Sequence, residues 1–125
     1  MLESTVRNIC PFVPAKDFET STRFYKELGF SCPDECEEVR FFQLGDHGFL
    51  LQDFWVEDWA ANFMMNLHVE DIRGWHKHLA SSGIFERYED TWFGEPKLED
   101  WGMWVMHFTD PTGVLWHVTM KPEPT

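Results

Sequence analysis

One histidine near the carboxyl terminus stands where side chains often do chemistry. The segment TDPTGVLWHVTM, residues 109–120, combines a turn with an apolar, strand-forming run that contains His117. An imidazole in this position can ligate a metal, act as a general base or line a cavity as a polar group. Which of these roles His117 has depends on the side chains that the fold places next to it.

Two further polar side chains fall on one face of the strand predicted within NFMMNLHV, residues 62–69. Strand side chains alternate between faces, which separates Met64, Asn66 and His68 from Phe63, Met65 and Leu67. We expect the apolar face to meet a helix, so that Asn66, His68 and His117 point together into the concave side of a sheet. Because no nucleophile or paired carboxylate is evident nearby, hydrogen-bonded polar lining is favoured over general-base chemistry, and no catalytic residue is assigned.

The elements that must position these residues recur in the chain. Two segments that stand 54 residues apart, KDFETSTRFYKELGF and EDIRGWHKHLASSGIF, begin around Asp17 and Asp71 and reach Gly29 and Gly83. Asp is a good helix N-cap, and Gly commonly ends a helix. Apolar residues fall at helical spacing in both segments, so each is predicted to be an amphipathic helix packed on a sheet.

Short strands flank each predicted helix. ICPFVPA (residues 9–15) and NFMMNLHV precede the helices, and two hairpins follow them, VRFFQL with GFLLQDF and MWVMHFT with VLWHVTM. Further strands near residues 30–32 and 84–88 complete the order β-α-β-β-β twice. We therefore predict an α+β fold in which residues 1–125 form a single domain. Its two βαβββ modules, about 1–58 and 59–125, form a curved mixed sheet around a cavity, with helices on the outer face.

These segments resemble the vicinal oxygen chelate superfamily, which includes glyoxalase I, extradiol dioxygenases and the bleomycin resistance proteins. KDFETSTRFYKELGF resembles its first helix and DPTG its last turn. CPFV and the Trp101-Gly102 pair are similar to bleomycin resistance proteins in particular. The resemblance implies a homodimer whose first strand is shared or swapped near Pro11, and a tryptophan, Trp101, that helps to hold a flat aromatic ligand.

Metal-dependent members of this superfamily place four ligands on strands that the internal repeat relates. The resemblance assigns these positions to Cys10, Gln52, Met64 and His117. A neutral amide and a thioether are poor ligands for Mg²⁺, Mn²⁺, Zn²⁺, Ni²⁺ or Fe²⁺, so we predict no metal and no other cofactor. Chemistry alone leaves open a soft Cu(I) site made from Cys, Met and His.

The acids and tryptophans complete the predicted ligand site. The run PDECEEV usually indicates a solvated surface, but the resemblance implies that acids here face a cationic ligand. A tryptophan in a loop or at a strand end serves either as a lid over a cavity or as part of a dimer interface, and both roles stay open. The predicted ligand-binding residues are Asp34, Glu35, Glu37, Trp55, Trp59, Asn66, His68, Trp101, Trp104 and His117.

Charge and cysteine content narrow the class of protein. The formal net charge of −12 disfavours binding to nucleic acid or to an anionic membrane and attracts cations. Three cysteines without CxxC spacing suggest neither a disulfide framework nor a zinc knuckle. No apolar run is long enough to span a bilayer, and the start of the chain does not look like a signal peptide. We expect a cytoplasmic protein.

Three functions remain at this point. The first is a metal-free protein that sequesters a planar or cationic small molecule, such as a bleomycin-type antibiotic, as the resemblance implies. The second is a metal-dependent lyase, isomerase or dioxygenase of the same superfamily, which the four ligand positions disfavour. The third is a structural dimer without a ligand, in which the tryptophans fill the interface.

Overall fold

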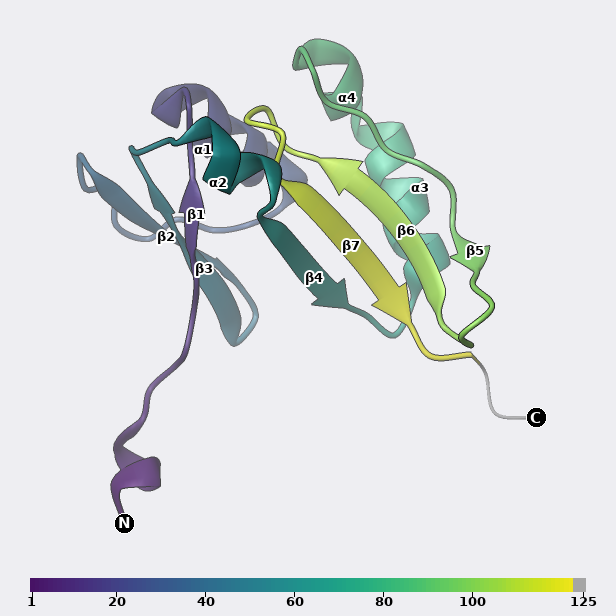
Figure 1. The fold of residues 1–125 in the computed structure, drawn as a ribbon, viewed down its shortest axis with the longest axis horizontal. Helices are drawn as coiled ribbons and strands as arrows, with labels where there is room; N and C mark the ends of the chain where they lie inside the picture. The colour runs from purple at the N-terminus through teal and green to yellow at the C-terminus, as the bar shows by residue number, and fades with distance from the viewer. Residues whose placement is uncertain (123–125) are drawn as a thin grey trace.

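The strands of this computed structural model, which describes residues 1–122, form two mixed sheets (Figure 1). The first sheet has the order β1-β3-β2 and contains Phe12–Pro14 (β1), Val39–Leu44 (β2) and His47–Gln52 (β3). The second sheet has the order β4-β7-β6-β5 and contains Met64–His68 (β4), Lys97–Leu98 (β5), Trp104–Thr109 (β6) and Leu115–Met120 (β7). In each sheet one edge strand, β1 or β4, runs parallel to its neighbour and the other pairs are antiparallel. The predicted α+β class with mixed strand orientation is confirmed.

The two long helices begin and end where their caps predict. Helix α1 (Phe18–Leu28) follows Asp17, whose Oδ1 accepts the Thr20 N–H at 3.1 Å, and helix α3 (Ile72–Ser82) follows Asp71, whose Oδ1 accepts the Gly74 N–H at 2.9 Å. Gly83 ends α3 with a φ of 73°, a left-handed conformation that costs glycine little. The shorter helices are η1 (Leu2–Thr5), α2 (Glu57–Ala61) and α4 (Ile84–Arg87).

The second strand of each predicted module, the one that follows the helix, differs from the prediction. Residues 84–88, predicted as a strand, form the helical turn α4, because the chain leaves Gly83 into a new turn that buries Ile84 and bonds the Tyr88 N–H to its carbonyl at 3.1 Å. The corresponding strand is β5, further along the chain. Residues 30–32 form only a single bridge, between Ser31 and Gln43, and Pro33 next to them has no N–H with which to extend a ladder.

A buried hydrogen-bond network joins the two halves of the core. The Tyr25 hydroxyl of α1 donates to Asp110 Oδ2 at 2.6 Å and accepts the Trp116 indole N–H at 2.9 Å. Asp110 Oδ1 accepts the three backbone N–H groups of the turn before β7, those of Thr112, Gly113 and Val114, each at 2.9 Å. Burial raises the pKa of Asp110 to about 6, against the lowering effect of these hydrogen bonds.

Both sheets leave one face free of helix. In β7, Trp116 and Val118 are buried in the core, and His117 between them points to the other face. We call the faces that carry no helix the open faces. The chain before β1, residues 1–11, forms an arm that includes η1 and leads away from the sheets beyond Pro11, whose carbonyl still accepts the Leu50 N–H (Figure 1). Among the described residues, no helix is both long and apolar enough to cross a membrane.

Candidate functional site

The open face of the second sheet brings three of the predicted residues together. His68 Nδ1 lies 2.9 Å from the Thr119 hydroxyl, which donates to Asn66 Oδ1 at 3.1 Å. Since the Thr119 hydrogen is used on Asn66, His68 Nδ1 must carry the proton that is donated to Thr119. These contacts orient the Asn66 amide and the second ring nitrogen of His68.

His117 occupies the same face but belongs to a different set of contacts. Its Nε2 lies 3.4 Å from Met64 Sδ, and its ring centroid lies 4.6 Å from that of His107 on β6. Burial lowers the pKa of His117, and the neighbouring His107 lowers it further. This direction favours the neutral form of the His117 imidazole, which can accept a hydrogen bond as well as donate one.

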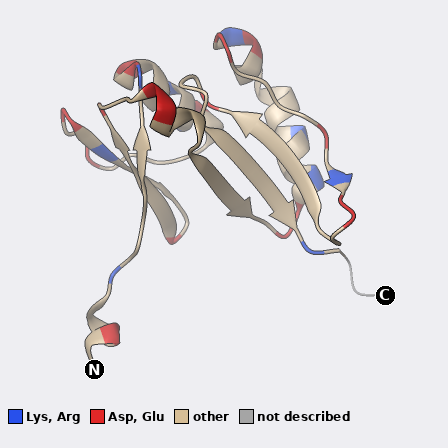
Figure 2. Cartoon of the chain, in the orientation of Figure 1, with Lys and Arg blue, Asp and Glu red and all other residues tan. Residues whose placement is uncertain are grey.

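The sequence analysis missed His107, although a signal was present. The DPTG turn makes a hairpin of β6 and β7, and that register places His107 directly opposite His117. Counting residues outward from the DPTG turn along both predicted strands pairs His107 with His117. The strands β4, β6 and β7 carry no Lys, Arg, Asp or Glu (Figure 2), so histidines are the only titratable side chains that these three strands carry.

The structure does not bring the four family ligand positions together within one chain. Met64 and His117 are neighbours, but Cys10 lies in the arm, where its Sγ contacts Asn8 Oδ1 at 3.5 Å, and Gln52 ends β3 in the other sheet. Within residues 1–122 no three His, Cys, Asp or Glu side chains are placed to hold an ion. An amide and a thioether are poor ligands for the family's metals.

The acidic residues line a hollow on the open face of the first sheet. Its volume is about 680 Å³, its rim carries Asp34, Glu37 and Glu38, and its apolar wall comes from β2 and β3. Glu35 does not line this hollow and instead pairs with Lys26 of α1. The acids and the histidines therefore lie on the open faces of two different sheets, which the sequence could not show.

Arg40 holds the acidic segment from the helix side of the sheet. Its Nε donates to the Cys36 carbonyl at 2.9 Å, and its two Nη atoms bind the Glu19 carboxylate at 3.0 and 3.1 Å. The hydrogen bonds to Glu19 raise the pKa of Arg40 above its ordinary value. The sequence analysis gave Arg40 no role, because an arginine in the predicted strand carries no signal of its partners.

The predicted tryptophans occupy different environments. Trp101, in the turn before β6, is 68% exposed and Trp59 in α2 is 69% exposed, whereas Trp55 lies under Lys16 with Nζ 4.8 Å from its ring centroid. Trp104 shares the helix-facing side of β6 with Met106, and Arg73 of α3 lies 5.2 Å from its ring centroid. The structure therefore directs Trp104 away from the open face.

Comparison with known proteins gives consistent matches. Residues 8–118 match the family model described as the glyoxalase/bleomycin resistance protein/dioxygenase superfamily. A bleomycin resistance protein from Klebsiella pneumoniae is 27% identical over 110 residues, which cover 84% of this chain and 85% of that protein.

Two solved structures have the same fold. A bleomycin-binding protein complexed with bleomycin has a TM-score of 0.79 and 24% identity, and the match covers 92% of this chain and 98% of that one. A bleomycin-binding protein from bleomycin-producing Streptomyces verticillus, complexed with copper(II)-bleomycin, has a TM-score of 0.75 and 18% identity, with 93% and 96% covered.

Proposed function

The chain belongs to the glyoxalase/bleomycin resistance protein/dioxygenase superfamily, and from this premise we propose that it binds and sequesters a planar, cationic small molecule such as a bleomycin-type antibiotic. One observation carries the proposal: two uncovered sheet faces present complementary groups, an acidic hollow on one and imidazole and amide groups on the other. The named relatives and structural neighbours, which are bleomycin resistance or bleomycin-binding proteins, support this class of ligand.

The acidic hollow suits the charged part of such a ligand. The hollow is lined by the acidic residues Asp34, Glu37 and Glu38 and by the apolar residues Val39, Phe41 and Leu50. The carboxylates attract a cationic group of the ligand, and the apolar side chains cover the apolar groups next to it. A cation over an aromatic ring gains about 0.5–2 kcal/mol per contact. Trp101, which is largely exposed, offers such a ring or a stacking surface for a flat group.

We further propose that the complete site forms between two copies of the chain, with the arm exchanged near Pro11. The apolar side chains of Leu2, Val6 and Ile9 on the arm are exposed, and Ile9 is 94% exposed. Strands β1 and β4 are sheet edges with unpaired backbone groups, which a strand from a second copy can cover. The acidic face of one copy then meets the histidine face of the other, which brings together groups that one chain keeps apart.

The ligand proposal is tested by titrating tryptophan fluorescence with a bleomycin-type glycopeptide and then with simpler aromatic cations. We expect submillimolar binding, which Trp101→Ala weakens about tenfold because an aromatic contact is worth roughly 0.5–1.5 kcal/mol beyond its buried area. Trp92→Ala, at a half-exposed tryptophan outside the predicted site, is the matched control. If no ligand changes the emission, or if Trp101→Ala alters only the stability of a dimer, the binding proposal fails.

The dimer proposal is tested by light scattering at micromolar concentration. We expect a mass of twice the 14.9 kDa of one chain. Ile9→Asp should shift the protein toward the monomer, because it places a charge in the exchanged arm, whereas Leu98→Asp, at an exposed apolar residue outside the arm, should not. A stable monomer of the unaltered chain would contradict arm exchange.

A further inference from the structure

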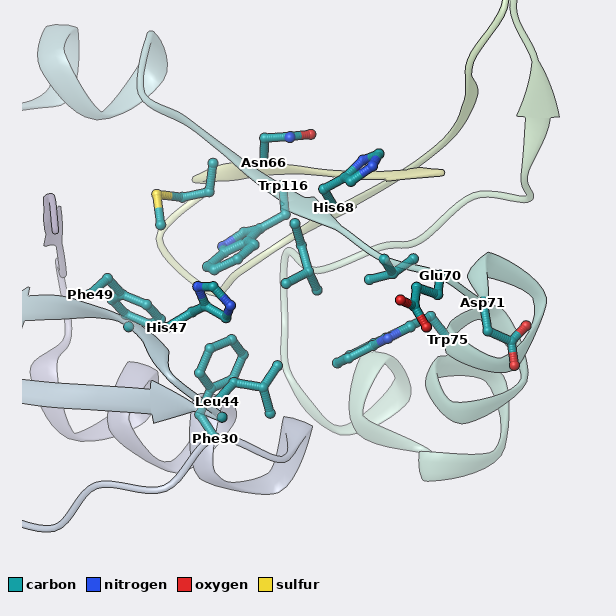
Figure 3. A pocket seen from close by; sticks show the side chains of 15 residues that line it. Phe30, Leu44, His47, Phe49, Asn66, His68, Glu70, Asp71, Trp75 and Trp116 are labelled. Carbon is teal, nitrogen blue, oxygen red and sulfur yellow. The ribbon is translucent and has the colours of Figure 1, made fainter. Parts of the chain in front are cut away.

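A second cavity lies where β4 and α3 face the end of the β2–β3 hairpin, and its volume is about 510 Å³ (Figure 3). One wall comes from the first half of the chain, with Phe30, Leu44 and His47. The opposite wall comes from the second half, with Glu70 and Trp75. It shares only Asn66 and His68 with the predicted ligand site, and neither half of the chain encloses it alone.

Aromatic rings give this cavity a fixed floor. Phe30, Phe49 and Trp116 are buried and pack against one another, with ring centroids 5.4 to 5.9 Å apart. Trp75 is only half-buried, and its ring packs edge-to-face with that of His78, with the two ring centroids 5.7 Å apart, which restricts its orientation. Figure 3 shows the Trp75 indole across the cavity from Leu44 and Phe30. The space between them is an apolar slot within the usual range of small-molecule sites.

The charged groups around the slot favour a cation. Glu70 and Asp71 line the cavity and no Lys or Arg does. The Asp71 carboxylate caps α3 through the Gly74 N–H, whereas Glu70 and Trp75 line the same side of the cavity (Figure 3). A cation placed there is attracted by the carboxylate and by the ring together. The net charge of −12 opposes entry of an anion.

We propose that this cavity is a separate binding site for a small amine with a flat aromatic body. The aromatic body lies in the slot between Trp75 and Phe30, and the ammonium group lies against Glu70. Its walls come from both halves of one chain, and it shares no lining residue with the acidic hollow. Binding in this cavity therefore does not require a second copy of the chain.

The experiment compares three probes that share an indole body. Tryptamine carries an ammonium group, 3-methylindole is neutral and indole-3-acetate is an anion. Calorimetric titration of the full chain should show submillimolar binding of tryptamine, weaker binding of 3-methylindole and no measurable binding of indole-3-acetate. Methyl resonances of Met65, Leu67 and Val69, which line the cavity, should shift with tryptamine. Absence of heat and of shifts at millimolar tryptamine would overturn the proposal.

A pair of variants separates a direct contact of the amine with Glu70 from the general effect of the protein's negative charge. Glu70→Gln should weaken tryptamine binding about two- to fivefold, as expected for an ion pair with an exposed carboxylate, and should leave the binding of 3-methylindole unchanged. Glu57→Gln in α2 makes the same change in net charge outside the cavity, and binding should stay within experimental error. Equal weakening by both variants would refute a contact at Glu70.

The location of the bound probe provides the last test. Tryptamine shifts confined to residues around Trp101 or His117 would place the amine on the open face and refute the cavity site. If intermolecular NOEs instead place the arm of a second copy against Leu67 and Val69, the cavity receives the arm, and the amine proposal is wrong. Thermal midpoints of Glu70→Gln and Glu57→Gln, expected to match the unaltered chain, confirm that both variants are folded.

Discussion

Replacing Tyr25 by Phe removes one oxygen atom from the buried network that joins α1 to the turn before β7. That hydroxyl is both the donor to Asp110 Oδ2 and the acceptor of the Trp116 indole N–H. The phenyl ring keeps its contacts with Phe42, Phe49 and Trp116, so the variant creates almost no cavity. The change therefore reports on hydrogen bonding rather than on packing.

The expected loss of stability follows from the two partners left without a hydrogen bond. A buried polar group deprived of its partner costs about 1–3 kcal/mol, and here there are two such groups, which gives about 2–6 kcal/mol. That is a large part of the roughly 5–15 kcal/mol by which small domains are stable. The variant should therefore fold with a much lower urea midpoint and an unchanged m-value.

Urea unfolding monitored by tryptophan fluorescence measures this loss, and the chain offers a matched control. Tyr88 is the only other tyrosine and is partly exposed, so Tyr88→Phe should cost less than about 1 kcal/mol. A loss below 1 kcal/mol for Tyr25→Phe, or equal losses for the two variants, would show that the network does not hold the two halves of the core together.

Two further predictions concern pH and the acidic segment. The pKa of Asp110 is about 6 in the folded chain against an ordinary 3.8, so the folded state holds this proton more tightly than the unfolded state. Its contribution to stability is therefore greatest below pH 4 and falls as the pH rises through 6. The free energy of unfolding measured in urea should therefore fall by about 3 kcal/mol over this pH range. Asp110→Asn should remove this dependence of stability on pH. Arg40→Met removes the donor to the Cys36 carbonyl, so it should lower stability by about 1–2 kcal/mol and speed amide exchange at residues 34–38, whereas an unchanged exchange rate would mean that Arg40 does not position the acids.

Local patterns were enough to predict the elements whose causes are local. Asp17 and Asp71 cap α1 and α3 with their own side chains, and Gly83 ends α3, so each signal lies within a few residues of its effect. Residues 39–44 form β2 with the bounds that the sequence predicts. The alternation in residues 64–68 likewise places Asn66 and His68 opposite the apolar Met65 and Leu67. These features needed no knowledge of distant contacts.

The prediction was wrong where two local signals competed. Residues 84–88 have strand-like composition. After α3 ends at Gly83, however, the chain forms a separate helical turn, α4, in which Ile84 is buried in the core. Trp104, at the end of a predicted strand, is expected to line the ligand site, whereas the pairing of β6 turns it toward Arg73 of α3. In both places the packing partner, which is remote in sequence, decides the outcome.

The sequence by itself determined the caps, the alternation, the repeat and the negative charge, because each depends on residue type and on spacing along the chain. Only the tertiary structure decided which groups share a surface. It paired His107 with His117, separated the acids from the histidines onto two sheets, and set Trp75 across a cavity from Phe30. Such pairings depend on strand register and on how two modules pack, and both are fixed by long-range contacts that no local pattern records.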